Sequence, residues 1–489
     1  MKLFRIRGGV HPQEHKQLSA HKAIEVMPMP ELLRIPLQQH IGSPAVPVVR
    51  KGDSVLKGQL LAHAQGMISA PVHAPTSGRI IAIGKHIAPH PSGLPVRTIT
   101  LKADGNDRWI DLPGPVDPFT LDANEISERV AAAGIVGMGG ASFPSAVKLN
   151  LGKRFSLHTL VINGAECEPY LTCDDRLMRE HATEILDGVR IMMRALGVAH
   201  CLFAIESNKA QAHEAISKAA GNHNGIHTVK VPVRYPMGSE KHLVQTLTGE
   251  ETPARALTAD IGVVVHNVAT AFAVHEAVRF HLPLISRVVT VSGGAIKHPR
   301  NLRVAVGTPV RELLAHCGGF REEPARLLSG GPMMGQPIIN TGIPVVKGSN
   351  AVLALTAAET ATHPAMPCIR CGSCVKACPC GLVPAEISAR TRHGDLQGAA
   401  DLGLMDCISC GSCAYVCPSH LPLVQYFNYA KGELTARQRA EHKQKETKRL
   451  AEQRAERIAR EKKAKREAMM RRRQAARKRT KSEKAGANV

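Results

Sequence analysis

The alternation of apolar and polar positions divides the chain into stretches of different character. Residues 1–120 contain short apolar runs separated by proline and glycine, which predicts strands joined by tight turns. KGDSV and KGQLL within residues 51–61 are turn–strand pairs, and APTSGRI at residues 74–80 is a turn leading into another strand. The first stretch is therefore predicted to be a β domain.

Strand-length apolar runs alternate with amphipathic stretches between residues 121 and 280. TLVING and HCLFAIES are predicted strands, whereas residues 124–134 and 182–197 place apolar residues at helical spacing. This alternation is typical of a mainly parallel, doubly wound sheet, so a Rossmann-like domain is predicted. Residues 281–350 return to short strands and turns, with one helix at ELLAHCGG, and predict a compact α+β module.

Cysteine and charge dominate the remaining two stretches. Residues 351–430 hold nine of the thirteen cysteines, with a helical linker predicted around residues 385–404. Residues 431–489 contain no proline. From Glu441 onward they carry 19 Lys/Arg and 7 Asp/Glu, a net charge of +12 out of +22 for the whole chain. A solvated basic helix is predicted there, because Glu and Lys/Arg recur four residues apart: Glu441/Lys445, Glu456/Arg460, Glu461/Lys465 and Glu467/Arg471.

The chain shows no membrane-spanning or secretory segment. No apolar run approaches the roughly 18 residues of a transmembrane helix. The start, MKLFRIRGG, lacks the apolar core and cleavage site of a signal peptide. We therefore expect a cytoplasmic protein, or one docked on a membrane from the cytoplasmic side. Densely spaced cysteines in such a chain indicate metal binding rather than disulfides.

Eight of these cysteines form two copies of one motif. CIRCGSCVKACP at residues 368–379 and CISCGSCAYVCP at residues 407–418 both read C-x2-C-x2-C-x3-C-P, the spacing of bacterial two-cluster ferredoxins. In that arrangement, three cysteines of one motif and the fourth of the other hold each [4Fe–4S] cluster. The expected ligand sets are Cys368, Cys371, Cys374 and Cys417 for one cluster, and Cys407, Cys410, Cys413 and Cys378 for the other.

Zinc is the alternative for this domain, because structural zinc sites also use C-x2-C pairs. The doubled motif favours iron–sulfur clusters, and crossed ligation keeps the two clusters close enough for electron transfer. Cys380 lies two residues beyond Cys378 and could compete with it, although the following proline favours Cys378. The other four cysteines are expected to be buried apolar residues: Cys167, Cys173, Cys201 and Cys317.

A glycine-rich loop, GIVGMGGASFPSAVKL, begins at Gly134 between two predicted helices. Its glycines would let backbone amides close on a phosphate, with the next helix N-terminus adding positive potential. Such clusters are more often plain turns, and this one matches neither the G-x-G-x-x-G nor the Walker pattern.

The loop resembles the flavin-binding loop of the NADH-oxidising, FMN-containing subunit of respiratory complex I, G-L-R-G-R-G-G-A-G-F-P-T-G-x-K-W. VINGAECEPY, YPMGSEKHLVQTLTG and HNVAT resemble three further segments of that subunit, in the same order. The resemblance implies binding of FMN and NAD(H) by these residues: Gly137, Gly139, Gly140, Phe143, Lys148, Asn163, Glu166, Glu168, Tyr235, Gly238, Glu240 and Asn267.

Particular roles are implied for several of these residues. Asn163 and Asn267 would hydrogen-bond FMN, and Lys148 would neutralise phosphate or ribose oxygens. Phe143 would offer a ring to the nucleotide. Glu166 and Glu240 would hold the nicotinamide end of NAD(H), with Glu168 supporting that loop. The sequence departs from the pattern at Met138, Ser142, Ser239 and Ala269.

The whole arrangement over residues 1–430 most closely resembles the C subunit of the Rnf (or Rsx) electron transport complex. Residues 48–84 resemble a lipoyl- or biotinyl-type barrel-sandwich domain without the carrier lysine, and residues 281–350 resemble the soluble-ligand-binding β-grasp (SLBB) domain. A multidomain α/β protein is thus expected: 1–120 barrel-sandwich-like, 121–280 FMN/NAD(H)-binding and Rossmann-like, 281–350 β-grasp, 351–430 two-cluster ferredoxin-like, and 431–489 basic tail.

The resemblance implies an oxidoreductase and translocase subunit on the cytoplasmic face of the bacterial inner membrane. Hydride would pass between NAD(H) and FMN, then single electrons through the clusters to other subunits, ferredoxin or another redox protein. Electron flow would be coupled to ion transport, and in some enteric relatives the complex keeps a redox-sensing regulator reduced. The tail would contact anionic lipid weakly.

Two other functions are considered. A pure electron-relay and docking subunit with a degenerate nucleotide site would explain the departures from the flavin pattern. Nucleic-acid binding is suggested only by the basic tail and is not expected, because the chain has few aromatic residues for base stacking. No Ser/His/Asp or metal–His constellation indicates hydrolysis, and no residue is assigned a catalytic role.

Overall fold

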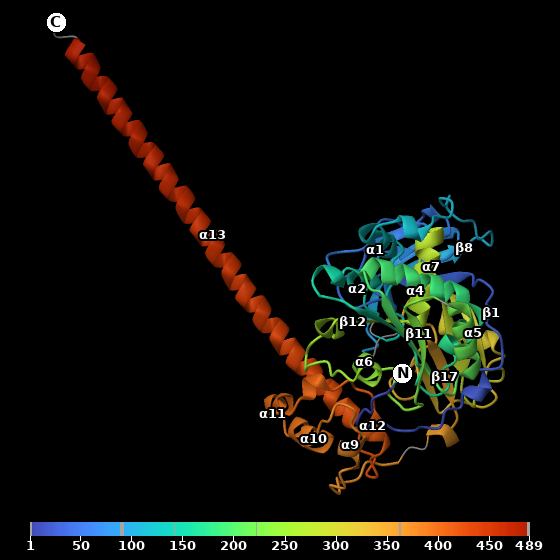
Figure 1. The fold of residues 1–489 in the computed structure, drawn as a ribbon. Helices are drawn as coiled ribbons and strands as arrows, with labels where there is room; N and C mark the ends of the chain where they lie inside the picture. The colour runs from blue at the N-terminus through green and yellow to red at the C-terminus, as the bar shows by residue number, and fades with distance from the viewer. Residues whose placement is uncertain (1, 89–91, 141, 222, 361–362, 487–489) are drawn as a thin grey trace.

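The computed structural model describes residues 2–88, 92–140, 142–221, 223–360 and 363–486. The chain forms a multidomain body from which one long helix projects as a straight rod (Figure 1). Within the described residues, no helix combines the length and the apolar character needed to cross a membrane.

The first domain is a β sandwich of two small sheets. One sheet has the order β2 (Leu32–Pro36), β8 (Pro95–Ala103), β7 (Gly78–Ile87) and β4 (Ser54–Val55); the other has the order β3 (Val46–Pro47), β5 (Leu60–His63) and β6 (Val72–His73). Leu33, Leu61 and Ile99 are fully buried between the sheets. The hairpin that bears the prosthetic group in carrier domains is buried here around Ala70 and Val72, so it serves as scaffold.

The second domain contains a parallel sheet in the order β11 (Ile226–Val231), β10 (His200–Glu206), β9 (Thr159–Gly164) and β12 (Val263–Asn267). Both faces are covered, which explains the continuous apolar runs of these strands. Leu160 and Ile162 face one core and Val161 faces the other. The first core is closed by α1 (Ala123–Ala132), α3 (Cys173–Glu180), α4 (Ala182–Leu196), α5 (Ala210–Ala220) and α7 (Val268–Phe280), and the second by α6 (Glu240–Thr248).

The third domain is a mixed sheet of six strands with α8 (Val310–His316) against it. The order is β1 (Glu25–Val26), β14 (Arg300–Ala305), β13 (Ser286–Ser292), β17 (Ala351–Leu355), β15 (Arg326–Ser329) and β16 (Gln336–Pro337). β17 lies between β13 and β15, so this sheet extends to Leu355, beyond the expected boundary at residue 350. β1 comes from the N-terminal segment, which is thus not confined to the sandwich domain.

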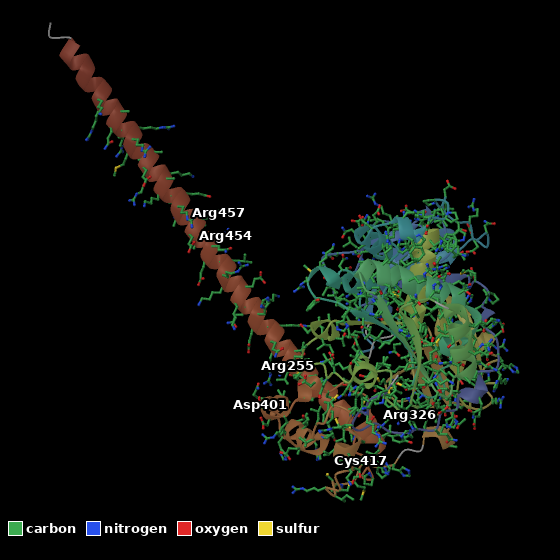
Figure 2. The ribbon with its side chains drawn as sticks, viewed as in Figure 1. Arg255, Arg326, Asp401, Cys417, Arg454 and Arg457 are labelled. Carbon is green, nitrogen blue, oxygen red and sulfur yellow. The ribbon has the colours of Figure 1, made fainter. Side chains whose placement is uncertain are left out.

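Short helices build the cysteine domain: α9 (Ser373–Ala377), α10 (Pro384–Arg392), α11 (Leu396–Asp401) and α12 (Ser412–Tyr415). The long helix α13 (Leu423–Gly486) begins inside this domain, where Leu423, Phe427 and Leu434 are buried. From residue 436 to residue 478 every side chain is exposed (Figure 2). The N-terminal segment links the domains, because Val10 pairs with Tyr235 and the Gly9 N–H donates to the Ala377 carbonyl at 2.9 Å.

Candidate functional site

Asn163 and Asn267 lie side by side at the carboxyl ends of β9 and β12, where they are register partners. β10 and β11 follow β9 on one side of the sheet, whereas β12 lies on its other side, so the order of strands reverses between β9 and β12. Doubly wound sheets bind ligands at the carboxyl ends of the strands at such a switch point. The fold thus brings together the two asparagines expected to contact FMN.

The glycine-rich loop runs beside this point, between α1 and α2 (Ser145–Leu149). Its ends are joined by a hydrogen bond from the Gly137 N–H to the Phe143 carbonyl at 2.7 Å. A Cβ on Gly139 would lie 3.3 Å from the Cβ of Asn267, whereas Gly140 has φ +143° and no heavy atom within 4 Å of a built Cβ. The loop therefore presents bare backbone at the switch point, which fits the close approach of a phosphate group. Ala141 lies outside the described residues.

Lys148 and Glu240, expected at opposite ends of the bound nucleotides, are paired with each other. The Lys148 Nζ lies 3.0 Å from a Glu240 carboxylate oxygen and also donates to the Val265 carbonyl at 3.1 Å. The Thr258 hydroxyl donates to the other oxygen of Glu240 at 2.9 Å. Both charged side chains remain partly exposed, at 25% for Lys148 and 44% for Glu240, so both are accessible to a ligand.

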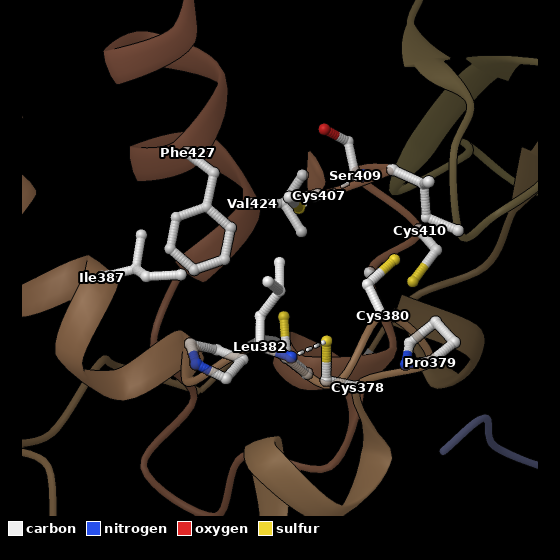
Figure 3. A pocket seen from close by; sticks show the side chains of 14 residues that line it. Cys378, Pro379, Cys380, Leu382, Ile387, Cys407, Ser409, Cys410, Val424 and Phe427 are labelled. Carbon is white, nitrogen blue, oxygen red and sulfur yellow. Dashed lines mark hydrogen bonds between the residues drawn. The ribbon is translucent and has the colours of Figure 1, made fainter. Parts of the chain in front are cut away.

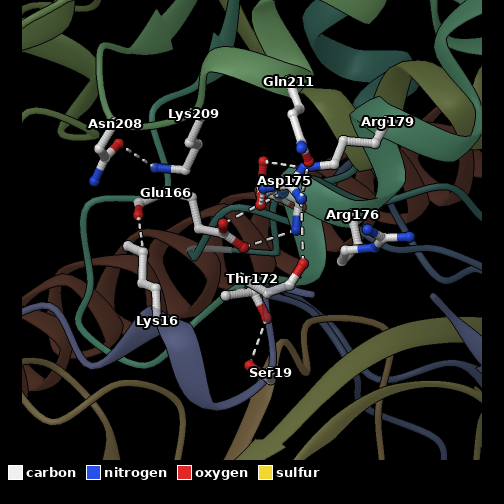
Figure 4. Close-up of polar contacts among 12 residues, drawn as sticks. Lys16, Ser19, Glu166, Thr172, Asp175, Arg176, Arg179, Asn208, Lys209 and Gln211 are labelled. Atoms are coloured by element: carbon white, nitrogen blue, oxygen red, sulfur yellow. Dashed lines mark hydrogen bonds and ion pairs between the residues drawn. The ribbon is translucent and has the colours of Figure 1, made fainter. Parts of the chain in front are cut away.

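Glu166 points at the N-terminus of α3 (Figure 4). Its carboxylate accepts hydrogen bonds from the Asp174 N–H at 2.7 Å and the Asp175 N–H at 3.3 Å, while its carbonyl accepts from the Lys16 Nζ at 2.9 Å. Glu166, Cys173 and Asp174 bring ligand-type atoms within 4.8 Å of one another, but these helix-capping contacts already account for that proximity. The expected contact of Glu166 with nicotinamide stays a prediction beside these protein contacts.

Asp174 is a site residue that the sequence did not single out. Its carboxylate accepts a hydrogen bond from the Asn267 Nδ2 at 2.7 Å, and the Asn267 Oδ1 accepts one from the Ala269 N–H. Burial, together with the nearby Glu166 charge, raises the pKa of Asp174 to about 7. The sequence feature that could have indicated Asp174 is the TCDDR segment, which places acidic residues at the start of a helix.

Glu168 joins the second domain to the β-grasp domain. Its carboxylate accepts hydrogen bonds from the N–H groups of Met333 at 3.1 Å and Met334 at 2.9 Å. Burial raises the pKa of Glu168 to about 7. The supporting role expected for Glu168 stays a prediction, and the described contacts of its carboxylate are with the β-grasp domain.

The segment 235–238 connects the switch point to the cysteine domain. The Asn163 Nδ2 donates to the Gly238 carbonyl at 2.8 Å, and the Gly238 N–H donates to the Cys167 Sγ at 3.3 Å. Tyr235 is 2% exposed, and its hydroxyl donates to the Cys410 carbonyl at 2.7 Å. Tyr235, expected among the cofactor-binding residues, therefore contacts a cysteine loop.

The eight motif cysteines line two small cavities. Cys378, Cys407, Cys410 and Cys413 line the first, which we call the inner cavity (Figure 3). Cys368, Cys371, Cys374 and Cys417 line the second, which we call the outer cavity. Each cavity thus takes three cysteines from one motif and one from the other, the grouping expected for crossed ligation.

The two motifs repeat one backbone geometry. Arg370 and Ser409 have φ of 55° and 54°, and each donates its N–H to a cysteine Sγ at 3.4 Å, that of Cys368 and Cys407 respectively. The Leu382 N–H donates to the Cys378 Sγ at the same distance. Four thiols around each cavity fit a cubane cluster, and the amide hydrogen bonds to Cys368, Cys378 and Cys407 would stabilise those three as thiolate ligands.

The cavities differ in exposure. Cys378, Cys410 and Cys413 are at most 8% exposed, whereas Cys368 and Cys371 lie at the surface. The inner cavity borders the second domain through Tyr235, and also through the His242 Nε2, which lies 3.0 Å from the Pro379 carbonyl. The outer cavity faces solvent.

Comparison with known proteins accounts for most of the chain. Residues 4–106 match the family model described as the RnfC barrel sandwich hybrid domain, and residues 130–276 match the Nuo51 FMN-binding domain. Residues 288–337 match the SLBB domain, and residues 367–421 match the 4Fe–4S dicluster domain.

The C subunit of the ion-translocating oxidoreductase complex of Rhodobacter capsulatus is 64% identical over 442 residues, which cover 90% of this chain and 85% of that protein. The chain belongs to this family, the RnfC family. The C subunit of the proton-translocating ferredoxin:NAD(+) oxidoreductase complex of Clostridium ljungdahlii is 45% identical over 429 residues, 87% of this chain and 93% of that protein. An NAD+-reducing [NiFe]-hydrogenase structure has a TM-score of 0.45 at 17% identity and covers 60% of each chain.

Membership in the RnfC family confirms the predicted multidomain α/β fold and its order of domains. The protein is a subunit of an oxidoreductase complex and acts in electron transport, with an FMN-binding domain and a 4Fe–4S dicluster domain. The dicluster match favours iron–sulfur clusters over zinc in the cysteine domain.

Proposed function

We propose that this chain is the peripheral subunit that exchanges electrons between NAD(H) and the iron–sulfur carriers of a membrane-bound complex. The subunit would work on the cytoplasmic face of the inner membrane. Electron flow between NAD(H) and ferredoxin-level carriers would be coupled to ion translocation; the relatives are named as subunits of an ion-translocating oxidoreductase complex and of a proton-translocating ferredoxin:NAD(+) oxidoreductase complex. When bound, FMN supplies the conversion between two-electron hydride chemistry and one-electron transfer, and the clusters supply one-electron carriers.

The hydrogen bond from the Tyr235 hydroxyl to the Cys410 carbonyl carries this proposal. It joins the lining of the inner cavity to segment 235–238. In the same segment, the Gly238 carbonyl accepts a hydrogen bond from the Asn163 Nδ2 at the switch point. One short segment therefore touches both the flavin side and a cluster site. This contact supports an order of flavin, inner cluster and outer cluster.

The residues of the switch point bind and orient the nucleotides in this proposal. Gly137, Gly139 and Gly140 offer backbone amides to phosphate, while Asn163 and Asn267 hold the flavin between β9 and β12. Glu240 accepts hydrogen bonds from NAD(H) on the exposed side, and Lys148, its ion-pair partner, neutralises phosphate or ribose oxygens. The four cysteines of each cavity would hold one [4Fe–4S] cluster.

The surface around the outer cavity suits an electron-transfer partner. Cys368 and Cys371 are exposed there beside Ile369, which is 68% exposed, and the exposed cations Arg370 and Lys376. Apolar area supports close contact, and positive charge attracts an acidic carrier by electrostatic steering. An acidic ferredoxin-like protein or domain is the partner that this surface fits.

Anaerobic purification with the membrane partners tests the proposal. We expect one FMN, about eight irons and about eight acid-labile sulfides per chain, because each cubane holds four of each. NADH should reduce both clusters, and removal of flavin should abolish the reduction. About four irons per chain, or zinc in their place, would overturn the two-cluster assignment.

A second candidate is an electron-relay and docking subunit without nucleotide chemistry. The ion pair between Lys148 and Glu240 favours it, as do the helix-capping contacts of Glu166, because these side chains already have protein partners. An iron-replete preparation that holds no flavin and does not react with NADH would establish this candidate. Bound flavin and reduction by NADH would exclude it.

A further inference from the structure

The inner cavity is lined by five cysteines, although a cubane needs four. Cys380 lies beside Cys378, Cys407, Cys410 and Cys413 in the lining. Figure 3 shows Cys378, Cys380 and Cys410 on the same side of the inner cavity. Among the residues that line the outer cavity, the four motif cysteines have no such companion.

Local structure explains why Cys380 reaches this cavity. Cys378 ends helix α9, and the chain turns at once through Pro379 and Cys380 to Gly381, whose φ is +66°. The turn keeps Cys380 only partly exposed and places it, with Cys378, in the lining of the inner cavity. Both sulfurs of this turn therefore border one cavity.

The opposite wall of the inner cavity belongs to the second motif. Ile408, which stands between Cys407 and Cys410 in that motif, lines the same cavity as Cys380. Cys378 receives an amide hydrogen bond from Leu382. Cys380 therefore shares its cavity with the loop that carries three of the other expected ligands.

We propose that Cys380 is a reserve ligand of the inner cluster, which binds iron through its Sγ when Cys378 is absent or displaced. The proposal rests on the assignment of a cluster to the inner cavity made above. Cys378 remains the resident ligand, because it holds the motif position before the proline. The exchange replaces one cysteine–iron bond by another without electron transfer: the Cys380 thiol loses its proton on binding, and the Cys378 sulfur gains one on release.

A reserve ligand matters at this cavity more than at the outer one. In the proposed order of carriers, the inner cluster stands between the flavin and every later carrier, so its loss would disconnect the whole chain of carriers. The outer cavity, at the surface, has no fifth cysteine in its lining.

Iron content of four anaerobically purified full-length variants tests the proposal. Cys378→Ala and Cys380→Ala should each keep the iron content of the natural chain, because either cysteine completes the inner set. The double variant should lose about half of the iron. Cys417→Ala is the matched control at the outer cavity and should also lose about half, since no neighbouring cysteine can replace it.

Electron paramagnetic resonance of the reduced variants gives a second readout. Cys378→Ala should keep two cluster signals, with the inner signal altered by the new ligand, whereas the double variant should keep only the outer one. FMN content and the thermal midpoint report whether each variant is folded. If Cys378→Ala does not fold, Cys378→Ser takes its place and is paired with the double variant Cys378→Ser/Cys380→Ala, which must lose the inner signal, because a serine oxygen can itself bind iron.

Loss of the inner cluster signal in Cys378→Ala or Cys378→Ser would overturn the reserve role of Cys380. Loss of the inner cluster signal in the single variant Cys380→Ala would also overturn it. If the natural chain itself holds fewer than two clusters, the assignment of a cluster to the inner cavity has failed. The two failures are therefore distinguishable in one set of preparations.

Discussion

At the scale of single residues, hydrogen bonds and an ion pair hold the side chains of the switch point in position. Asn163 is fixed by Gly238, Asn267 by Asp174, and Lys148 by Glu240. A ligand that enters must exchange some of these bonds for its own, so the residues with the most exposure are the ones it reaches most easily. Glu240 is such a residue.

Replacement of Glu240 by alanine should weaken NAD(H) binding while FMN stays bound. A hydrogen bond to a charged group contributes about 1.5–3 kcal/mol, so the loss of affinity should be roughly 10- to 100-fold. Equilibrium titration with NADH under anaerobic conditions measures it. Asn163→Ala should instead release FMN. The control Glu214→Ala, which removes an exposed carboxylate on α5, should change neither NADH affinity nor FMN content. If Glu240→Ala binds NADH as tightly as the natural chain, Glu240 is not part of the NAD(H) site.

The buried lysine Lys347 should make stability depend on pH. Its Nζ donates to the carbonyls of Pro71 at 2.8 Å and Gly134 at 2.6 Å, which joins the sandwich domain to the start of the glycine-rich loop. Burial lowers the pKa of Lys347 to about 7, below the ordinary value of 10.5. Between these values the folded state binds fewer protons than the unfolded state, so the stability contribution rises as pH increases from about 7.

Thermal unfolding of the natural chain and of Lys347→Met at pH 7 and pH 9 measures this effect. The natural chain should gain stability relative to the variant on going to pH 9. A difference in midpoint that stays constant with pH would mean that Lys347 keeps an ordinary pKa in the folded protein.

At the scale of secondary-structure elements, the N-terminal segment holds the inner-cavity turn in place. Gly8 has φ +59°, and a Cβ there would lie 2.4 Å from the backbone carbon and oxygen of Cys378. The added Cβ would meet backbone atoms of Cys378, which cannot rotate away as the end of a side chain could. The segment therefore fits only while position 8 lacks a side chain.

Gly8→Ala should displace the segment and destabilise the inner cluster. Gly66→Ala is the matched control, because Gly66 also has positive φ, +78°, but no heavy atom near a built Cβ. Left-handed strain of roughly 1–2 kcal/mol affects both variants, so only Gly8→Ala should lose iron or show altered cluster spectra. Equal iron content in the two variants would show that the contact is dispensable.

The elements themselves were largely predictable from sequence, because each carries its own periodicity. TLVING became β9, residues 124–134 contain most of α1, and the linker around residues 385–404 contains most of α10 and all of α11. The pairing of β1 with β14 and the insertion of β17 between β13 and β15 were not predicted, since such pairings join residues far apart and leave no local pattern. The same holds for the site: motif spacing predicted the grouping of the cysteines, whereas the contacts of Glu166 and Asp174 depend on tertiary structure.

At the scale of the whole molecule, a compact body carries a charged rod. Helix α13 has 64 residues, so it is roughly 95 Å long at 1.5 Å per residue. Among the side chains of the rod that the structure describes, to residue 478, the large apolar ones are Leu450, Ile458, Met469 and Met470, which form no continuous apolar face, so this part does not resemble an amphipathic helix that inserts into a bilayer. Basic side chains such as Arg454 and Arg457 extend into solvent instead (Figure 2).

Truncation after Ala440 should lower binding to anionic vesicles without changing the clusters or the reaction with NADH. The cut leaves Leu434 and the buried start of α13 in place. Each basic residue near an anionic surface contributes roughly 1 kcal/mol, screened over about 10 Å at 0.1 M salt. Vesicle sedimentation at low and high salt measures binding, with uncharged zwitterionic vesicles as control. Equal binding with and without the tail would leave protein partners as the only anchor.

Each cavity is lined by one cysteine of the other motif, and this arrangement also constrains the order of events in biosynthesis. The outer cavity combines Cys368, Cys371 and Cys374 with Cys417, the last of the eight to leave the ribosome. The inner cavity in turn depends on Cys378 from the earlier motif. An iron donor that meets the nascent chain before Cys417 has emerged finds the outer set incomplete. In the proposed crossed ligation, loading of both sites as a pair therefore follows synthesis of the chain through Cys417.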